Sequence, residues 1–175
     1  MRMEKGYTLI ILLFAIFIMG LGLMLAVPVL QTQIQREKEE ELIFRGKQYV
    51  EAVRIFQMKY PGAFPKTLED LQKERCIRQL YKDPMTNLGE WDLILQYTST
   101  SPGRAGTSAH KVLIAPSNNL SSIDNPRILG VVSSSPKKSI KIYLGQQTYN
   151  KWLFYYGQDP NKMPEIIYYG EAEKK

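Results

Sequence analysis

Few residues of this chain have the type and spacing that enzyme chemistry requires. Its one histidine, His110, lies in a Gly/Ser-rich stretch, where a single histidine is usually solvated. Ser108 and Ser135 lack the glycine-flanked turn of a nucleophilic serine, and no zinc-protease helix, CxxC pair or phosphate loop is present. The single cysteine, Cys76, excludes an internal disulfide and fits a small buried apolar residue. The sequence therefore predicts a protein that is not an enzyme.

Oxygen-bearing side chains gather in two turn-rich segments. Carboxylate and amide oxygens are the ligands that Ca²⁺ prefers in proteins, so each segment is a candidate calcium site. Neither has the regular ligand spacing of a known calcium loop, and a solvated turn is the alternative interpretation of both. Apart from calcium, no cofactor is expected. The candidate ligands are Asp83, Asn87, Glu90 and Asp92 in the segment DPMTNLGEWD, and Asp124 further along the chain.

The chain is basic, with a formal net charge of +6 and a pI near 9.3. In one segment three lysines lie beside three aromatic residues, and such a cluster could bind nucleic acid through phosphate contacts and base stacking. The alternative is that the lysines are solvated and the rings belong to the core. We favour the alternative and do not expect DNA to be a partner. The cluster consists of Lys137, Lys138, Lys141, Tyr143, Tyr149 and Trp152.

The N-terminal part of the chain is an apolar run, residues 7–30, with no charged side chain between Gly6 and Arg36. As a helix it would be roughly 36 Å long, which is enough to cross the hydrocarbon core of a bilayer. It exceeds the ~7–15-residue apolar core of a secretory signal, and no small-x-small cleavage site follows it. Two basic residues flank each side, so the positive-inside rule leaves the orientation open. The short N-terminus favours Arg2 and Lys5 in the cytoplasm, with the rest exported.

The helical pattern continues through residues 31–60 and ends at Pro61-Gly62. Glu41 and Arg45 have the spacing of a favourable i,i+4 ion pair. Glu39 is expected on the outer face of the helix. One apolar stripe is expected to pack against a globular head, and it consists of Leu42, Tyr49, Val53, Phe56 and Tyr60.

The remaining residues, 61–175, predict a short helix followed by strands. Thr67 and Asp70 have the spacing of a capping box at the start of that helix. In residues 91–97 every second side chain is apolar from Trp91 onward, so the strand is expected to be half-buried with Ile94 on its outer face. Further strands are expected at 111–115, 128–132 and 139–144, with weaker patterns at 149–156 and 166–169. The predicted fold is α+β, with a long helix packed on a small antiparallel β-sheet.

At the N-terminus, Lys5 and Gly6 are followed by the aromatic Tyr7, then by Thr-Leu-Ile and a long apolar helix. This pattern resembles the N-terminus of type IV pilins and type II secretion pseudopilins. The resemblance implies that a prepilin peptidase cuts after Gly6 on the cytoplasmic side and methylates the new amine of Tyr7. It also implies a pilin-like head and helices that pack together in a filament. The implied membrane and assembly residues are Thr8, Leu9, Ile10, Ile11, Leu12, Phe14 and Pro28.

Four parts of the chain are therefore expected. They are a cleaved leader (1–6), a membrane-spanning and assembly half of the helix (7–30), an amphipathic half (31–60) and a globular α+β head (61–175). Pro28 lies where the family usually has a proline within the helix. Because proline removes a backbone donor, a kink or local melting is expected there.

Ile11 departs from the family pattern, which places a glutamate at this position. That carboxylate is thought to pair with the amine of a neighbouring subunit, since an unpaired carboxylate at this depth in the membrane is costly. Isoleucine removes this drive towards polymerisation. Two alternatives follow: a tip or accessory subunit that needs no amine partner, or a shaft subunit that assembles by apolar packing alone.

The expected function is that of a structural pilin-like subunit of an envelope filament or pseudopilus, with type II protein secretion favoured. The expected location is the bacterial inner membrane, crossed once, with the C-terminal head periplasmic or otherwise extracytoplasmic. The expected partners are the lipid bilayer, other pilin-like subunits, the prepilin peptidase and the inner-membrane assembly platform. The alternatives are a signal-anchored periplasmic binding module or enzyme, and a minor pilin of DNA uptake or adhesion.

Overall fold

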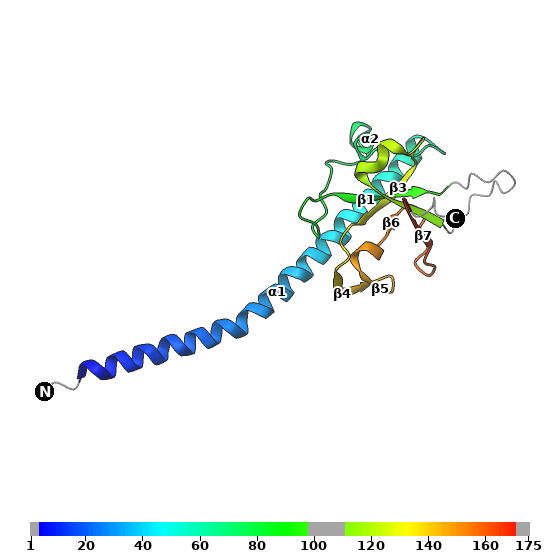
Figure 1. Cartoon of the computed structure of the whole chain (residues 1–175). Helices are drawn as coiled ribbons and strands as arrows, with labels where there is room; N and C mark the ends of the chain where they lie inside the picture. Colours follow the sequence, from blue (N-terminus) through cyan, green and yellow to red (C-terminus); the bar gives the residue numbers. More distant parts are fainter. Residues whose placement is uncertain (1–3, 98–110, 171–175) are drawn as a thin grey trace. The chain divides into compact units, whose positions relative to one another are not determined.

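The computed structural model describes residues 4–97 and 111–170, except for the side chains of 4–6 and 25–29. Its longest element, the helix α1, runs from Glu4 to Lys59 (Figure 1). The chain divides into two compact units, Met1–Glu37 and Lys38–Lys175. His110 and Ser108, which were considered above for catalysis, lie outside the described residues.

The first unit is helical, and it contains a segment, Tyr7–Met24, that is long and apolar enough to cross a membrane. No residue of this segment is buried. The helix continues without a break through Pro28, so the local melting expected there is absent. A proline inside a helix removes one backbone hydrogen bond, which a long apolar helix can lose without ending.

The second unit, which we call the head, includes the C-terminal part of α1. The apolar stripe predicted there is confirmed for four residues. Tyr60 is the exception, because it follows the last helical residue, is 45% exposed and donates its hydroxyl to the Glu74 carboxylate. The Glu41–Arg45 ion pair is also confirmed, with 2.7 Å between Oε1 and Nε. The buried members of the stripe are Leu42, Tyr49, Val53 and Phe56.

The short helix α2, Leu68–Lys73, begins with the predicted capping box. The Thr67 hydroxyl accepts the Asp70 N–H at 3.3 Å, and the Asp70 carboxylate accepts the Thr67 N–H at 3.0 Å. Both otherwise orphaned donors at the helix start are satisfied in this way. Leu71 faces inward and is fully buried.

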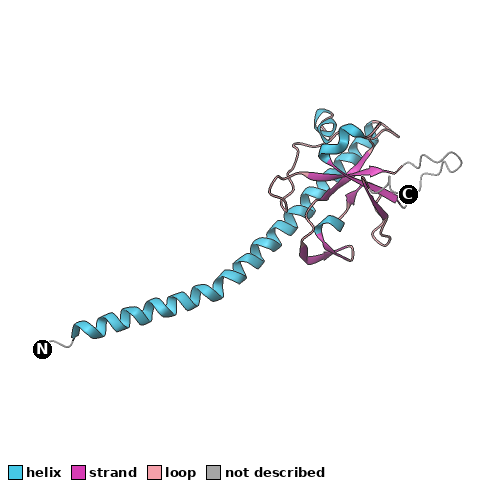
Figure 2. Cartoon of the chain, viewed as in Figure 1, coloured by secondary structure: helices cyan, strands magenta, loops and turns pink. Residues whose placement is uncertain are grey.

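The head contains a five-stranded sheet in the order β6-β3-β1-β2-β7 (Figures 1 and 2). β1 pairs antiparallel with β2 and β3, and β3 pairs antiparallel with β6, but β7 runs parallel to β2. The prediction of an antiparallel sheet is therefore wrong for β7. The alternation of side chains has the same period in both kinds of strand, so it does not report strand direction. The strands are β1 (Trp91–Gln96), β2 (Lys111–Pro116), β3 (Ile128–Ser133), β6 (Phe154–Tyr155) and β7 (Glu165–Tyr168).

The central strand, β1, is buried on both faces. Trp91, Leu93 and Leu95 belong to the cluster that includes the stripe of α1. Ile94 is fully buried in a second cluster on the opposite face, together with Ile114. The prediction that Ile94 faces solvent is therefore wrong. Every strand has two faces, and its own alternation does not show whether the second face is covered.

A two-stranded antiparallel ribbon, β4 (Lys138–Tyr143) and β5 (Gln146–Thr148), forms a sheet of its own. Its turn consists of Leu144 and Gly145, with φ values of 47° and 77°. Two consecutive positive φ values match a type I′ hairpin turn, so Leu144 ends the strand earlier than predicted. The 3₁₀ turn η1, Ser117–Ser122, follows β2.

Residues 149–156, predicted as one strand, are divided between two elements. The 3₁₀ turn η2, Tyr149–Lys151, is followed by the two-residue strand β6. The rings of Tyr149 and Trp152 are buried in the core of the head. Aromatic residues are frequent in strands, but here the burial of two large rings close together in sequence takes the place of strand pairing.

Candidate functional site

The membrane and assembly residues predicted from the sequence lie on the part of α1 that belongs to the first unit. Gly6 and Pro28 are part of the helical backbone. The other predicted residues are exposed, and because they follow one another they surround the helix on all sides. A helix that is apolar all round needs lipid or other helices as its surroundings. The exposed residues are Tyr7, Thr8, Leu9, Ile10, Ile11, Leu12 and Phe14.

Glu39 is the residue of the head that the sequence prediction missed. It is fully buried, although it was expected on the outer face of the helix. Its Oε1 accepts hydrogen bonds from the Ile140 N–H and the Tyr149 hydroxyl, both at 2.7 Å. Its Oε2 accepts the Lys141 N–H at 2.9 Å. The carboxylate therefore joins α1 to the β4–β5 ribbon and to η2.

The position of Glu39 could have been read from its spacing. It precedes Leu42 by three residues, and residues three apart lie on the same face of a helix. The prediction of an outer face relied on the charge of the side chain instead. A buried carboxylate is tolerated when hydrogen-bond donors compensate for the loss of hydration, and charge-assisted bonds of this length are among the stronger ones.

Two further contacts hold the ribbon on the head. The Lys141 ammonium lies 2.6 Å from the carboxylate of Glu40, the neighbour of Glu39. The Tyr143 ring packs on the rings of Trp152 and Phe154, with centroids 5.6 and 5.2 Å apart. The inner face of β4 thus carries the residues that attach it, and the outer face is left exposed.

The lysine and aromatic cluster considered above for nucleic acid is divided by the fold. Lys137 and Lys138 are exposed at the start of β4. Tyr149 and Trp152 are buried, and the Trp152 Nε1 donates to the Gln146 carbonyl at 3.0 Å. In this arrangement these two rings are not accessible for base stacking.

The calcium candidates have different surroundings. Asp83 is buried, and its carboxylate accepts the Ser133 hydroxyl at 2.6 Å and the Met85 N–H at 2.8 Å. Burial raises the pKa of the Asp83 carboxyl. Burial also raises the pKa of the half-buried Asp92 carboxyl, and the nearby charge of Asp83 raises it further. Asn87, Glu90 and Asp124 are exposed.

Within the part of the chain that the structure describes, no three acidic, histidine or cysteine side chains come close enough together to hold a metal ion. Each oxygen of Asp83 already accepts one hydrogen bond, from the Met85 N–H within the turn before β1 and from the Ser133 hydroxyl of β3. Calcium binding therefore stays a prediction, and the geometry of the described residues adds no support to it.

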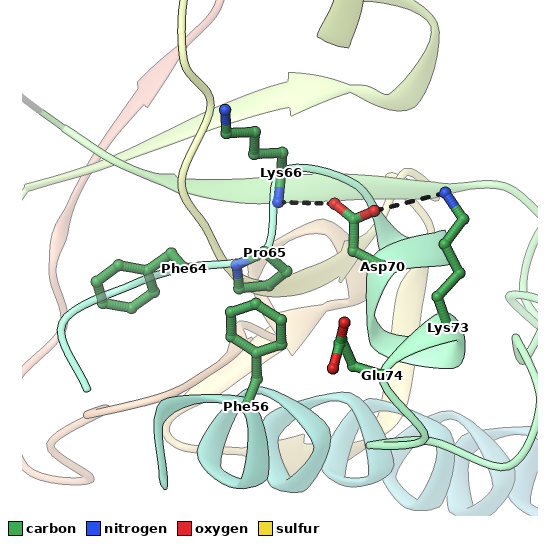
Figure 3. Close-up of a pocket in the computed structure, with 7 residues that line it drawn as sticks. All are labelled: Phe56, Phe64, Pro65, Lys66, Asp70, Lys73 and Glu74. Carbon is green, nitrogen blue, oxygen red and sulfur yellow. Dashed lines mark hydrogen bonds and ion pairs between the residues drawn. The ribbon is translucent and has the colours of Figure 1, made fainter. Parts of the chain in front are cut away.

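A shallow pocket of about 240 Å³ lies beside the end of α1 (Figure 3). Phe56, Phe64 and Pro65 form its apolar side. Two of the charged residues around it are engaged with each other, because the Asp70 carboxylate, which caps α2, lies 3.7 Å from the Lys73 ammonium. This volume is below the usual range of ligand pockets, about 300–1,000 Å³.

No protein-family model, curated protein or solved structure matches this chain. Any statement about its function therefore rests on its own residues and their geometry.

Proposed function

We propose that this protein is a pilin-like structural subunit of an envelope filament or pseudopilus, with type II protein secretion as the favoured machine. One observation supports the proposal above the others. A single helix, α1, combines an exposed apolar segment, Tyr7–Met24, with a C-terminal part that buries an apolar stripe in an α+β head. Lys5 and Gly6, which with Tyr7 resemble a prepilin cleavage site, stand directly before the apolar segment that Tyr7 begins.

In the proposed role the apolar segment has two successive environments. It first anchors the subunit in the inner membrane, where its exposed side chains contact lipid. In the assembled filament the same side chains pack against the helices of other subunits. Cleavage after Gly6 frees the amine of Tyr7 without removing the anchor, which distinguishes this processing from that of a secretory signal.

Ile11 favours an accessory or terminal position in the filament rather than the shaft. A carboxylate at this depth is tolerated only when it is paired, and the amine of an adjacent subunit would be its partner. With isoleucine the subunit has no such requirement. By this reasoning the protein alone forms few filaments.

The experiment that tests the role is a count of filaments in cells that contain the assembly machinery. Ile11→Glu should increase incorporation of the protein into sheared filaments, counted by electron microscopy, because the carboxylate can pair with a neighbouring Tyr7 amine. The matched control, Leu13→Glu, places the same charge at nearly the same depth on another side of the helix. It should not increase incorporation. Abundant filaments from the unmodified protein, lost on Ile11→Glu, would contradict the accessory role and favour apolar packing.

A signal-anchored binding module is the competing proposal. The pocket beside Phe56 is its best structural support, but its small volume and locally neutralised charges argue for no particular ligand. The two proposals differ in the fate of residues 1–6, which only the pilin-like role removes.

A further inference from the structure

The turn before β1 carries the most exposed large apolar side chain that the structure describes. Leu88 is 80% exposed, a larger fraction than that of any large apolar residue in the segment Tyr7–Met24. Single exposed apolar residues are common on protein surfaces, so exposure alone does not indicate a contact. The way in which the turn is held and the surface that it matches give the further evidence.

The turn is fixed to the head at its base. The Asp83 N–H donates to the Gly89 carbonyl at 2.9 Å, and the Asp83 carboxylate accepts the Ser133 hydroxyl of β3 at 2.6 Å. The Arg45 guanidinium of α1 donates to the Lys82 carbonyl, also at 2.6 Å. A turn held in this way has little conformational freedom left to lose on binding, which lowers the cost of a contact.

The pocket beside the end of α1 is a matching surface on the same head. Phe56, Phe64 and Pro65 form its apolar side, and its volume is about 240 Å³ (Figure 3). An apolar cavity of about 150 Å³ holds a benzene molecule, so this pocket has room for one leucine side chain although it is small for a free ligand. Leu88 does not line the pocket of its own chain. A second copy of the chain therefore offers a pocket that this leucine can fill.

Opposite charges stand beside the two surfaces. Glu90, two residues after Leu88, is exposed, and so is Lys66, which lines the pocket. Figure 3 shows the Lys66 ammonium extending away from Phe56. Within the described residues, neither Glu90 nor Lys66 forms an ion pair in its own chain. The two side chains are thus available to each other when the turn of one copy meets the pocket of another.

The other acidic groups of the pocket already have partners. The Asp70 carboxylate caps α2 and lies 3.7 Å from the Lys73 ammonium. The Glu74 carboxylate accepts the Tyr60 hydroxyl at 2.8 Å. Lys66 is therefore the charged group of the pocket that is left for an incoming carboxylate.

We propose that Leu88 of one head inserts into the pocket formed by Phe56, Phe64 and Pro65 on a second copy of this chain, with Glu90 paired to Lys66 across the contact. The two surfaces differ, so the contact is heterologous, and each copy has one of each to offer to its neighbours. The contact is a property of the head, and it depends neither on cleavage after residue 6 nor on the pilin-like role.

The contact is weak by its size. One turn in one pocket covers far less than the ~1,200 Å² of a stable protein interface. It therefore joins heads only where the chains are already concentrated, as they are when a membrane or a filament holds them together. A contact of this strength agrees with a protein that forms few filaments alone.

The test is a cross-linking experiment with two preparations of the full chain in detergent, each with its own affinity tag. Both carry Cys76→Ala, which removes the single buried thiol. One carries Asn87→Cys beside the leucine, and the other carries Ala63→Cys beside the pocket; both positions are exposed. The preparations are mixed and treated with a short bismaleimide, and products that contain both tags are measured. The matched control replaces Asn87→Cys with Ile142→Cys, which is 64% exposed on β4.

We expect the 87–63 pair to cross-link several-fold faster than the 142–63 pair. Leu88→Asp in the first preparation should lower the rate to that of the control, because a charged side chain does not enter an apolar pocket. Glu90→Lys in the first preparation, or Lys66→Glu in the second, should each lower the rate. The two changes together should restore it, since the pair is then reversed. The fluorescence of the buried Trp91 and Trp152 reports that each variant is folded.

Equal rates for the 87–63 and 142–63 pairs would overturn the contact. A rate that Leu88→Asp leaves unchanged would overturn the insertion of the leucine. Charge reversals that do not compensate for each other would overturn the pairing of Glu90 with Lys66. None of these rates depends on whether residues 1–6 are present, so failure of this contact is distinguishable from failure of the pilin-like role.

Discussion

Glu39, on α1, is joined to two segments of the head, β4 and η2, whose bonded residues are 101 to 110 positions further along the chain. Its two oxygens accept three hydrogen bonds, from the backbone of Ile140 and Lys141 and from the hydroxyl of Tyr149. If the carboxylate is lost, two backbone donors and a hydroxyl lose their acceptor in a buried position. Leaving a buried polar group unsatisfied costs about 1–3 kcal/mol.

Glu39→Gln should therefore lower the free energy of unfolding of the head by about 2–4 kcal/mol, because an amide offers one acceptor oxygen where the carboxylate offers two. The adjacent Glu40 is 69% exposed and makes only a surface ion pair among the described contacts. Glu40→Gln should cost much less than Glu39→Gln, because exposed ion pairs contribute little to stability. Denaturant unfolding followed by tryptophan fluorescence measures both variants. Equal losses would mean that the Glu39 bonds do not stabilise the ribbon.

Asp83 gives a prediction about pH. Burial raises the pKa of its carboxyl above the ordinary value of 3.8, although the Ser133 and Met85 bonds act in the opposite direction. Between that value and the raised pKa the folded chain binds more protons than the unfolded chain, so the free energy of unfolding falls as pH rises. Asparagine does not titrate. The stability of Asp83→Asn relative to the unmodified protein should therefore increase with pH across this interval.

The measurement is a set of denaturant titrations of both proteins from about pH 3.5 to 7. The surface carboxylates Glu40 and Glu51, whose pKa values are lowered by Lys141 and Arg54, are present in both proteins and cancel in the difference. A difference that stays constant with pH, or falls, would contradict the assigned direction.

At the scale of elements, two glycines let secondary structures approach closely. A Cβ at Gly46 would overlap the ring of Phe154, and one at Gly130 would overlap the Phe154 carbonyl oxygen. The first glycine brings α1 against β6, and the second brings β3 against the same strand. β6 has only two residues, and Gly130 is also the register partner of Tyr155 in the β3–β6 pair.

Gly46→Ala should destabilise the head by about 1–2 kcal/mol, since overpacking costs roughly 1–3 kcal/mol and the gain in helix propensity returns up to about 1. Gly130→Ala should cost more, because its obstacle is backbone and cannot rotate away. Lys47→Ala, on the exposed side of the same helical turn, should change stability by less than about 0.5 kcal/mol. A stabilising Gly46→Ala would show that the Phe154 ring moves freely.

The elements differ in how far the sequence could predict them. The helix, its apolar stripe, the Thr67 capping box and most strand positions follow from local periodicity and end signals. The direction of β7 and the second buried face of β1 depend on which segments meet in the fold, whereas the three-residue spacing from Glu39 to Leu42 did indicate the buried face of α1. The exposed isoleucines of β4 were also not predictable, because alternation gives two faces without saying which one is covered.

At the scale of the whole molecule, one helix has two parts whose residues differ in character. In the segment Tyr7–Met24 every side chain is exposed and apolar or small, as lipid or a helical partner requires. In the head the same helix carries a narrow buried stripe, a buried carboxylate and charged outer residues. The pilin-like proposal accounts for both parts, and it makes a definite statement about the start of the mature protein.

That statement is tested most directly by the intact mass of the protein purified from membranes of cells with an active prepilin peptidase. The proposed function predicts a chain that begins at Tyr7 and carries the mass of one added methyl group. Gly6→Ala should block the cut, because a side chain at the scissile position crowds the peptidase active site. Retention of Met1 through Gly6 in the unmodified protein would contradict the pilin-like role and leave a signal-anchored protein as the better account.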